Sequence, residues 1–67
     1  MAKKVMVVNG LVIAEHNARE RADGFDWYGV YLKEEWVMAS GYRNVEMECG
    51  TLETAKAFAA DYYTEVD

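Results

Sequence analysis

Residues 7–13 read VVNGLVI, and this stretch decides how the first part of the chain folds. Two runs rich in Val, Leu and Ile flank the pair Asn9-Gly10. Asn and Gly tolerate the positive φ angles that a two-residue type I′ turn requires. A turn pair of this kind between two apolar, β-branched runs predicts a β-hairpin.

A helix is the competing interpretation of the same region. It would begin near Leu11 and end at Gly24 as a C-terminal cap, with three alanines sharing one face. The hairpin is the favoured prediction, because the stretch is so rich in Val and Ile. Residues 16–25 then form a polar connection with room for one helical turn.

Residues 26–42, DWYGVYLKEEWVMASGY, hold both tryptophans and three of the five tyrosines. We expect two further strands here, joined by a loop around residues 33–35. That loop contains no glycine, which favours a four-residue loop on a type I turn over a tight two-residue turn. An even-numbered loop gives one mainly aliphatic face, made of Tyr28, Val30, Leu32, Val37 and Ala39. The opposite face then carries Trp27, Gly29, Tyr31, Trp36, Met38, Ser40 and Tyr42. A three-residue loop would change this partition.

The C-terminal part predicts a last strand followed by a helix. Residues 43–49, RNVEMEC, alternate between an apolar side with Val45, Met47 and Cys49 and a polar side with Asn44, Glu46 and Glu48. Thr51 is the expected N-cap of the helix, and Glu53 in the first turn suits the helix dipole. One apolar stripe at helical spacing comprises Leu52, Ala55, Phe58, Ala59, Tyr62 and Val66. We therefore predict an α+β fold, a small antiparallel sheet of four to five strands with one C-terminal helix packed on one face.

Composition limits the classes of function. The 67-residue chain has 52% hydrophobic residues and a net charge of −5, which indicates one folded domain over residues 1–67, small enough to gain stability from a partner. Its negative charge opposes nonspecific binding to nucleic acids and anionic membranes. No apolar run is long enough for a membrane span or a signal peptide. We expect a cytoplasmic protein that binds neither nucleic acid nor membranes directly.

Residues suited to catalysis or metal binding are few. One cysteine and one histidine cannot form a disulfide or a zinc site of the usual kind. Cys49 falls on the apolar side of its strand, where a small buried hydrophobe is expected, and His16 lies in a polar segment as a solvated residue. The sequence DGFD at residues 23–26 marks a turn and lacks the alternating acids of a calcium loop. The sequence thus predicts no enzyme, no cofactor and no metal site.

The predicted aromatic face is the first candidate for a binding surface. Since one helix covers only one side of a small sheet, the other side is left with Trp27, Tyr31, Trp36, Met38 and Tyr42. Trp, Tyr and Met are enriched where interfaces concentrate their binding energy. The alternative is that the N-terminal hairpin or the connection at residues 16–25 folds over this face and buries it.

The acidic side chains are the second candidate. Glu46 and Glu48 are expected on one strand face, with their carboxylates roughly 6.6 Å apart along the strand. With neighbouring acids they could imitate a phosphate backbone and block a protein that binds nucleic acid. The alternative is an ordinary solvated acidic face.

The last strand and the GTLETAKAFAADYY stretch resemble the strand-to-helix ending of many small bacterial and phage α+β proteins. The profile as a whole, short, acidic and free of cofactors, resembles phage-encoded inhibitors of host machinery, anti-CRISPR proteins in particular. This resemblance implies a non-enzymatic inhibitor of a host nucleic-acid-binding complex. The residues themselves, not the resemblance, suggest the aromatic face and the acidic side chains as its contact surface. A small structural module that homodimerises through the same face is the alternative.

Overall fold

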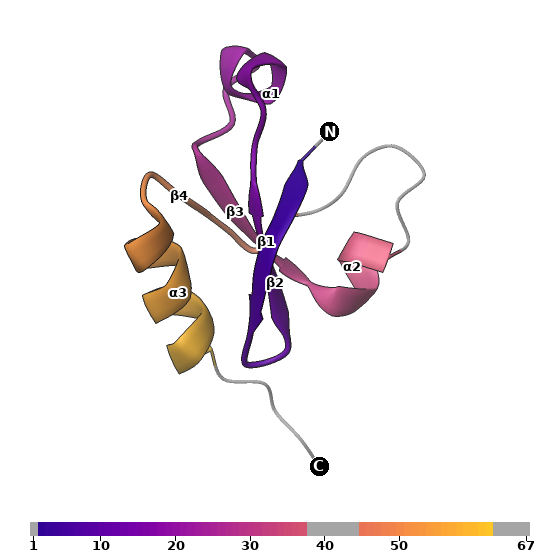
Figure 1. Cartoon of the computed structure of the whole chain (residues 1–67), viewed down its shortest axis with the longest axis vertical. Coiled ribbons are helices and arrows are strands. Elements are labelled where there is room, and N and C mark those ends of the chain that lie inside the picture. The colour runs from indigo at the N-terminus through magenta and orange to yellow at the C-terminus, as the bar shows by residue number, and fades with distance from the viewer. Residues whose placement is uncertain (1, 38–44, 63–67) are drawn as a thin grey trace.

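The computed structural model describes residues 2–37 and 45–62. Within them the strands β1, β2, β3 and β4 form one antiparallel sheet in the order β1-β2-β3-β4 (Figure 1). The α+β prediction, a small antiparallel sheet with a C-terminal helix on one face, is confirmed. The elements in chain order are β1 (Lys3–Val8), β2 (Leu11–Glu15), α1 (Ala18–Ala22), β3 (Tyr28–Leu32), α2 (Lys33–Val37), β4 (Met47–Cys49) and α3 (Leu52–Asp61).

The predicted hairpin is confirmed. Asn9 and Gly10 have φ angles of 53° and 79°, and β1 and β2 pair on either side of them. The competing helix from Leu11 to Gly24 is wrong, because β2 extends to Glu15. Between Leu11 and Gly24 the only helix is the five-residue α1. It begins with a capping box between Asn17 and Glu20.

The region after β3 differs from the prediction. Residues 33–37 form α2 rather than a loop and the start of a strand, so the expected placement of Val37 on the aliphatic strand face with Val30 and Leu32 is wrong. Lys and Glu are good helix formers, and Glu34 and Glu35 lie in the first turn, where acidic residues favour a helix. The other expected strand positions, Met38, Ala39, Ser40 and Tyr42, lie outside the described residues, as does Asn44.

The predicted C-terminal helix is present, and the predicted last strand is present as Met47–Cys49, so Glu46 precedes the strand and does not lie in it as expected. The Thr51 side chain caps α3 by accepting a hydrogen bond from the Thr54 amide at 3.2 Å, as expected. In β4, Cys49 lies on the α3 side of the sheet. Val45 precedes the strand and packs against the opposite cluster, so its predicted placement on one side with Met47 and Cys49 is wrong. Val66 lies outside the described residues.

The sheet carries a separate cluster of buried side chains on each face, and α3 and α2 lie on opposite sides of it in Figure 1. The α3 side is built on Leu11, Ile13, Val30, Cys49, Ala55 and Ala59, with the predicted face residues Tyr28 and Leu32 packed against them. The α2 side is built on Ala2, Val12, Ala14 and Tyr31, with Trp36 and Val45 packed against them. The aromatic side of the sheet is therefore partly covered.

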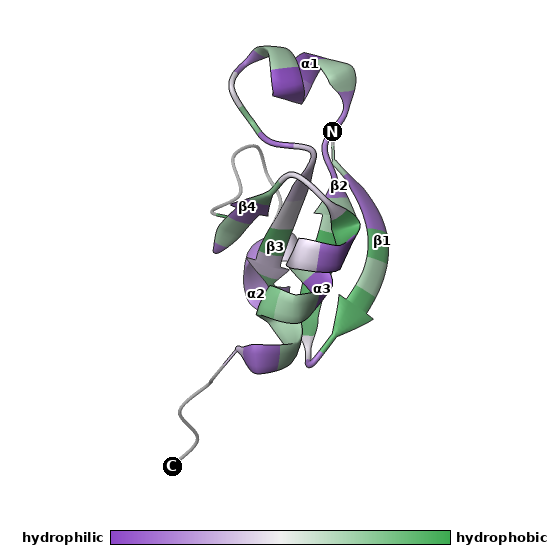
Figure 2. Ribbon diagram, turned by 90° about the vertical axis from the view of Figure 1, so that its left-hand side faces the viewer, coloured by the Kyte–Doolittle hydropathy of each residue, from purple (hydrophilic) through white to green (hydrophobic). Residues whose placement is uncertain are grey.

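The helix α3 lies close to the sheet, because the stripe that it buries includes small side chains. Ala55 and Ala59 are fully buried, and Phe58 and Tyr62 extend the contact. At its C-terminal end the Nδ2 atom of Asn9, in the hairpin turn, donates to the carbonyl oxygens of Ala59 and Tyr62, at 3.1 and 3.0 Å. Figure 2 shows α3 beside the apolar end of β1, where the strand changes from hydrophilic to hydrophobic toward the turn.

Candidate functional site

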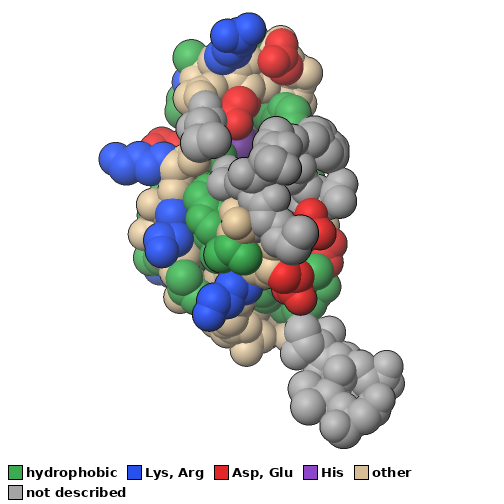
Figure 3. All heavy atoms as spheres, turned by 90° about the vertical axis from the view of Figure 1, so that its right-hand side faces the viewer, with side chains coloured by type: hydrophobic (Ala, Val, Ile, Leu, Met, Phe, Trp, Pro, Cys, Tyr) green, Lys and Arg blue, Asp and Glu red, His purple; other side chains and the backbone are tan. Residues whose placement is uncertain are grey.

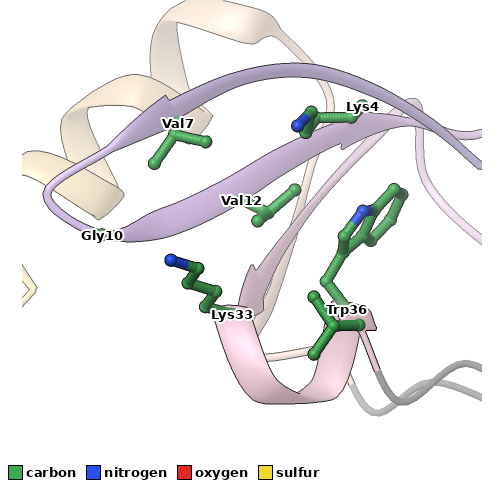
Figure 4. Close-up of a pocket in the computed structure, with 7 residues that line it drawn as sticks. Lys4, Val7, Gly10, Val12, Lys33 and Trp36 are labelled. Carbon is green, nitrogen blue, oxygen red and sulfur yellow. The ribbon is translucent and has the colours of Figure 1, made fainter.

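The described surface has an apolar groove of about 270 Å³ between the β1–β2 hairpin and α2, on the side of the sheet opposite α3. In Figure 4, Val12 lies at its centre, Trp36 closes one end, and Lys4 and Lys33 project from opposite walls. Two of its apolar residues are strongly exposed: Val7 retains 54% and Val37 68% of its accessible surface. The lining residues are Lys4, Val7, Gly10, Val12, Lys33, Trp36 and Val37.

A register shift in β1 places Lys4 on the wall of the groove. Side chains of a strand alternate between the two faces, and one extra residue moves those beyond it to the other face. Between Lys4 and Met6 the register shifts by one residue, so Met6 pairs with Ile13 while Lys4 pairs with Ala14. Ile13 and Ala14 belong to opposite faces, so Met6 packs toward α3 and Lys4 joins the groove.

The second wall depends on α2. One turn of helix after β3 brings the Trp36 ring back over Tyr31, with ring centroids 5.3 Å apart and the planes at 60°. This edge-to-face contact is a favoured arrangement of aromatic rings. It fixes α2 on the sheet and leaves Lys33 and Val37 along the open side of the groove.

Charge around the groove differs from that of the chain as a whole. Figure 3, which views the α2 side, shows basic side chains along one border of a hydrophobic patch and acidic side chains beyond the other border. The chain has seven basic residues against twelve acidic ones, and within the described part of the chain Lys4 and Lys33 line this groove. The groove is thus an apolar surface with locally positive edges on an acidic protein.

The predicted aromatic face is dispersed. Among the described members of this face, Tyr31 is buried, with 3% of its surface exposed, and Trp36 alone lines the groove. Trp27 precedes β3 and is half-exposed, and the Arg21 guanidinium stacks 3.7 Å from the centroid of its ring. The described aromatic residues Trp27, Tyr31 and Trp36 therefore do not form one continuous open face. Met38 and Tyr42 lie outside the described residues.

The two predicted acidic residues are engaged by the chain itself. The Tyr62 hydroxyl donates to Glu46 at 2.6 Å, and the backbone amide of Asp26 donates to Glu48 at 2.8 Å. The Glu46 carboxylate raises the pKa of Tyr62 by accepting this hydrogen bond. The two carboxylates thus bind groups from different parts of the chain, one at the C-cap of α3 and one in the connection before β3.

His16 is not the solvated residue that its polar segment predicts. It is fully buried, and its ring is hydrogen-bonded at both nitrogens. Nδ1 donates to the Asp26 carbonyl at 2.8 Å, since a carbonyl can only accept, and Nε2 lies 2.7 Å from the Tyr31 hydroxyl. Phe25 packs edge-on against the same ring. The histidine joins β2, β3 and the connection between them.

Cys49 is buried, as predicted. Burial raises the pKa of its thiol, and the nearby Asp26 carboxylate raises it further. A raised pKa keeps the thiol protonated and a poor nucleophile at neutral pH. Within residues 2–37 and 45–62, no three His, Cys, Asp or Glu side chains gather in a way that could hold a metal ion.

Sequence reasoning missed most of the groove. Lys4, Val7, Lys33 and Val37 were not expected to form a site. The apolar residues of β1 offered a usable signal for a binding surface, because part of an apolar run on an edge strand stays exposed. The register shift and the helical turn of α2, which bring the two walls together, have no clear signature in the sequence.

Comparison of the chain with protein-family models, curated proteins and solved structures gave no match. Among the described residues, no helix is long and apolar enough to span a membrane.

Proposed function

We propose that this protein is a non-enzymatic protein-binding module whose contact surface is the groove between the β1–β2 hairpin and α2. The observation that carries the proposal is the exposure of apolar side chains around a formed hollow. Val7 and Val37 stand open on either side of a floor at Val12, and Trp36 closes one end. Contiguous apolar surface on a small domain commonly marks an interaction site.

The size of the groove favours a macromolecular partner over a small molecule. Its volume of about 270 Å³ lies below the range of roughly 300–1,000 Å³ that is usual for ligand pockets. It suits one or two apolar side chains of another protein. Trp36 is held in place by its contact with Tyr31, and rigid tryptophans are frequent among residues that dominate binding energy.

The state of the two reactive side chains supports a non-enzymatic role. His16 is fully buried, with both ring nitrogens hydrogen-bonded to the chain's own groups. Cys49 is buried, with a raised pKa. Each of these residues has a structural role, and neither opens onto the groove.

Within this class, the hypothesis suggested by the sequence is a phage-type, anti-CRISPR-like inhibitor that acts in the cytoplasm by occupying a host nucleic-acid-binding complex. The strand-to-helix resemblance and the acidic composition support it. We take the groove, and not an aromatic sheet face, as the proposed contact surface, and Trp36 belongs to both. Homodimerisation through the groove is the alternative function.

The proposal is tested by capture of partners from a lysate of candidate host cells, with groove variants beside the wild-type protein. Val7→Glu and Val37→Glu place a charge on each wall. Met47→Glu is the matched control, because Met47 is an exposed apolar residue on β4, away from the groove. Circular dichroism of each variant confirms that it folds.

We expect the wild-type and Met47→Glu proteins to retain the same specific partner and both groove variants to lose it. Capture that is equal in all four proteins, or absent in all, contradicts the proposal. Light scattering distinguishes the alternative function from binding of a different protein. A wild-type dimer that becomes a monomer on Val37→Glu indicates homodimerisation through the groove.

A further inference from the structure

We infer that the groove takes a short amphipathic helix of the partner, with apolar side chains on its inner face and acidic side chains flanking them. This inference rests on the proposed protein-binding function and specifies the chemistry of the partner. Three features carry it: the charge on the groove walls, the lysines and register shift on the edge strand β1, and the burial of the apolar stripe of α3 against the chain's own sheet.

The charge complement of the groove is acidic. Lys4 rises from the β1 wall and Lys33 from the α2 wall, so a partner that fills the apolar floor passes between two ammonium groups (Figure 4). The acidic side chains beyond the other border of the patch (Figure 3) and the net charge of −5 repel an acidic partner away from the two lysines. Carboxylates on either side of an apolar anchor are therefore attracted to this place in particular, which sets position and orientation.

An added β-strand is disfavoured as the occupant. In the described sheet β1 is an edge strand, the kind of element to which an extended peptide can pair. However, β1 begins with Lys3 and Lys4, and its register shifts between Lys4 and Met6. Lysines and bulges at an edge strand both hinder pairing with another chain. The partner therefore contacts the floor of the groove with its side chains and does not pair its backbone with β1.

The shape of the groove suits a helix that presents side chains at spacings of three or four. The floor lies at Val12, Trp36 closes one end, and the two walls carry the exposed Val7 and Val37. Helix-in-groove recognition seats apolar residues of one helical face in such a hollow. Acidic residues one turn before and after the anchors then lie near the lysines.

A second copy of the chain does not supply such a helix from its described residues. Of the described helices, only α3 is longer than five residues. Its apolar stripe packs on the chain's own sheet, with Ala55 and Ala59 fully buried. A different protein is therefore the favoured source of the helix.

A display library of random peptides, each about 14 residues long and thus about four helical turns, tests the inference. The library is selected on the intact wild-type protein and counter-selected on Val37→Glu. The enriched peptide is synthesised with a fluorescent label and titrated by anisotropy against wild-type protein and the double variant Lys4→Glu/Lys33→Glu. A peptide with proline at its centre and one with Lys in place of its acids are the matched controls.

We expect enriched peptides with apolar residues three or four apart and flanking Asp or Glu. The double variant should bind the acidic peptide about tenfold or more weakly and should bind the lysine version better than the wild-type protein does. Central proline should abolish binding. Salt should weaken it.

Other outcomes overturn the inference. These are no enrichment, an alternating extended pattern, undiminished binding of the proline peptide, or equal affinity for the charge-reversed protein. A dimer of the wild-type protein that Val37→Glu dissociates also overturns it, in favour of a second copy. If groove variants lose the partner in the lysate while the library yields no acidic helix, the proposed function stands and only this inference fails. Lysate capture that is unaffected by the groove variants removes both.

Discussion

Among the glycines that the structure describes, Gly29 has the closest neighbouring side chains. It lies in β3 on the α2 side of the sheet, beneath the buried His16 ring. A Cβ atom added there would lie 2.9 Å from His16 Cε1, His16 Nε2 and Tyr31 Cε1. Those rings cannot move freely, because His16 is hydrogen-bonded to both the Asp26 carbonyl and the Tyr31 hydroxyl. Glycine at this position therefore makes room for the histidine that joins β2, β3 and their connection.

Gly29→Ala should lower the free energy of unfolding by about 1–3 kcal/mol, the usual effect of overpacking a filled site. Urea unfolding followed by circular dichroism measures it. Gly50→Ala is the control, because a Cβ there meets only the Asp26 Oδ1 atom at 3.7 Å, an ordinary contact. A loss of stability in the control as large as that in Gly29→Ala would show that the tight contact is not the cause.

At the scale of elements, the hairpin turn does more than reverse the chain. Asn9 adopts a positive φ of 53°, and its side chain donates to two carbonyl oxygens at the C-terminal end of α3. The last carbonyls of a helix have no partners within the helix. One residue thus links the first element pair of the sequence to the last helix, so the turn and α3 stabilise each other.

Asn9→Gly keeps the turn conformation and removes both side-chain hydrogen bonds. We expect it to cost about 1–2 kcal/mol of unfolding free energy, given the usual net worth of such bonds. Asn9→Ala should cost about 1 kcal/mol more, because alanine is strained at positive φ. Thermal and urea unfolding of the two variants separate the contributions. Equal stability of Asn9→Gly and the wild-type protein would contradict the capping role.

At the scale of the whole molecule, the sheet is packed on both faces, and the two tryptophans have different roles. Trp36 packs on Tyr31 and covers part of the α2-side cluster, while Trp27 is 49% exposed beneath the Arg21 guanidinium. The same α2 turn that covers the sheet also forms one wall of the groove. A change at Trp36 therefore affects both the stability of the fold and the proposed binding surface. A change at Val37 affects the binding surface alone.

Trp36→Ala should destabilise the fold by about 2–3 kcal/mol, somewhat less than for a fully buried tryptophan. Trp27→Ala should cost less than about 1 kcal/mol, since it removes an exposed cation–π contact. Chemical denaturation of both variants measures the difference. The opposite order of stability would mean that the sheet face next to α2 depends on Trp27 and not on Trp36.

Much of the fold could be predicted from residues that act locally. Asn9-Gly10 determines the hairpin through its backbone preferences, and Thr51 with the apolar stripe after it determines α3. The alternation of Tyr28, Val30 and Leu32 identified the face that α3 covers. The burial of Cys49 followed from the same period of two. Each of these signals lies within a few residues of the structure that it specifies.

The tertiary structure decided the rest, because the deciding contacts join residues far apart in sequence. His16 lies in a polar segment, and its burial depends on Asp26 and Tyr31. The sequence KEEWV is compatible with a loop and strand or with a helix, and the helix places Trp36 on Tyr31. The shift that turns Lys4 into the groove appears only when β1 is paired with β2. The sequence by itself determined the sheet and the helix on it, whereas packing across the second face determined the groove.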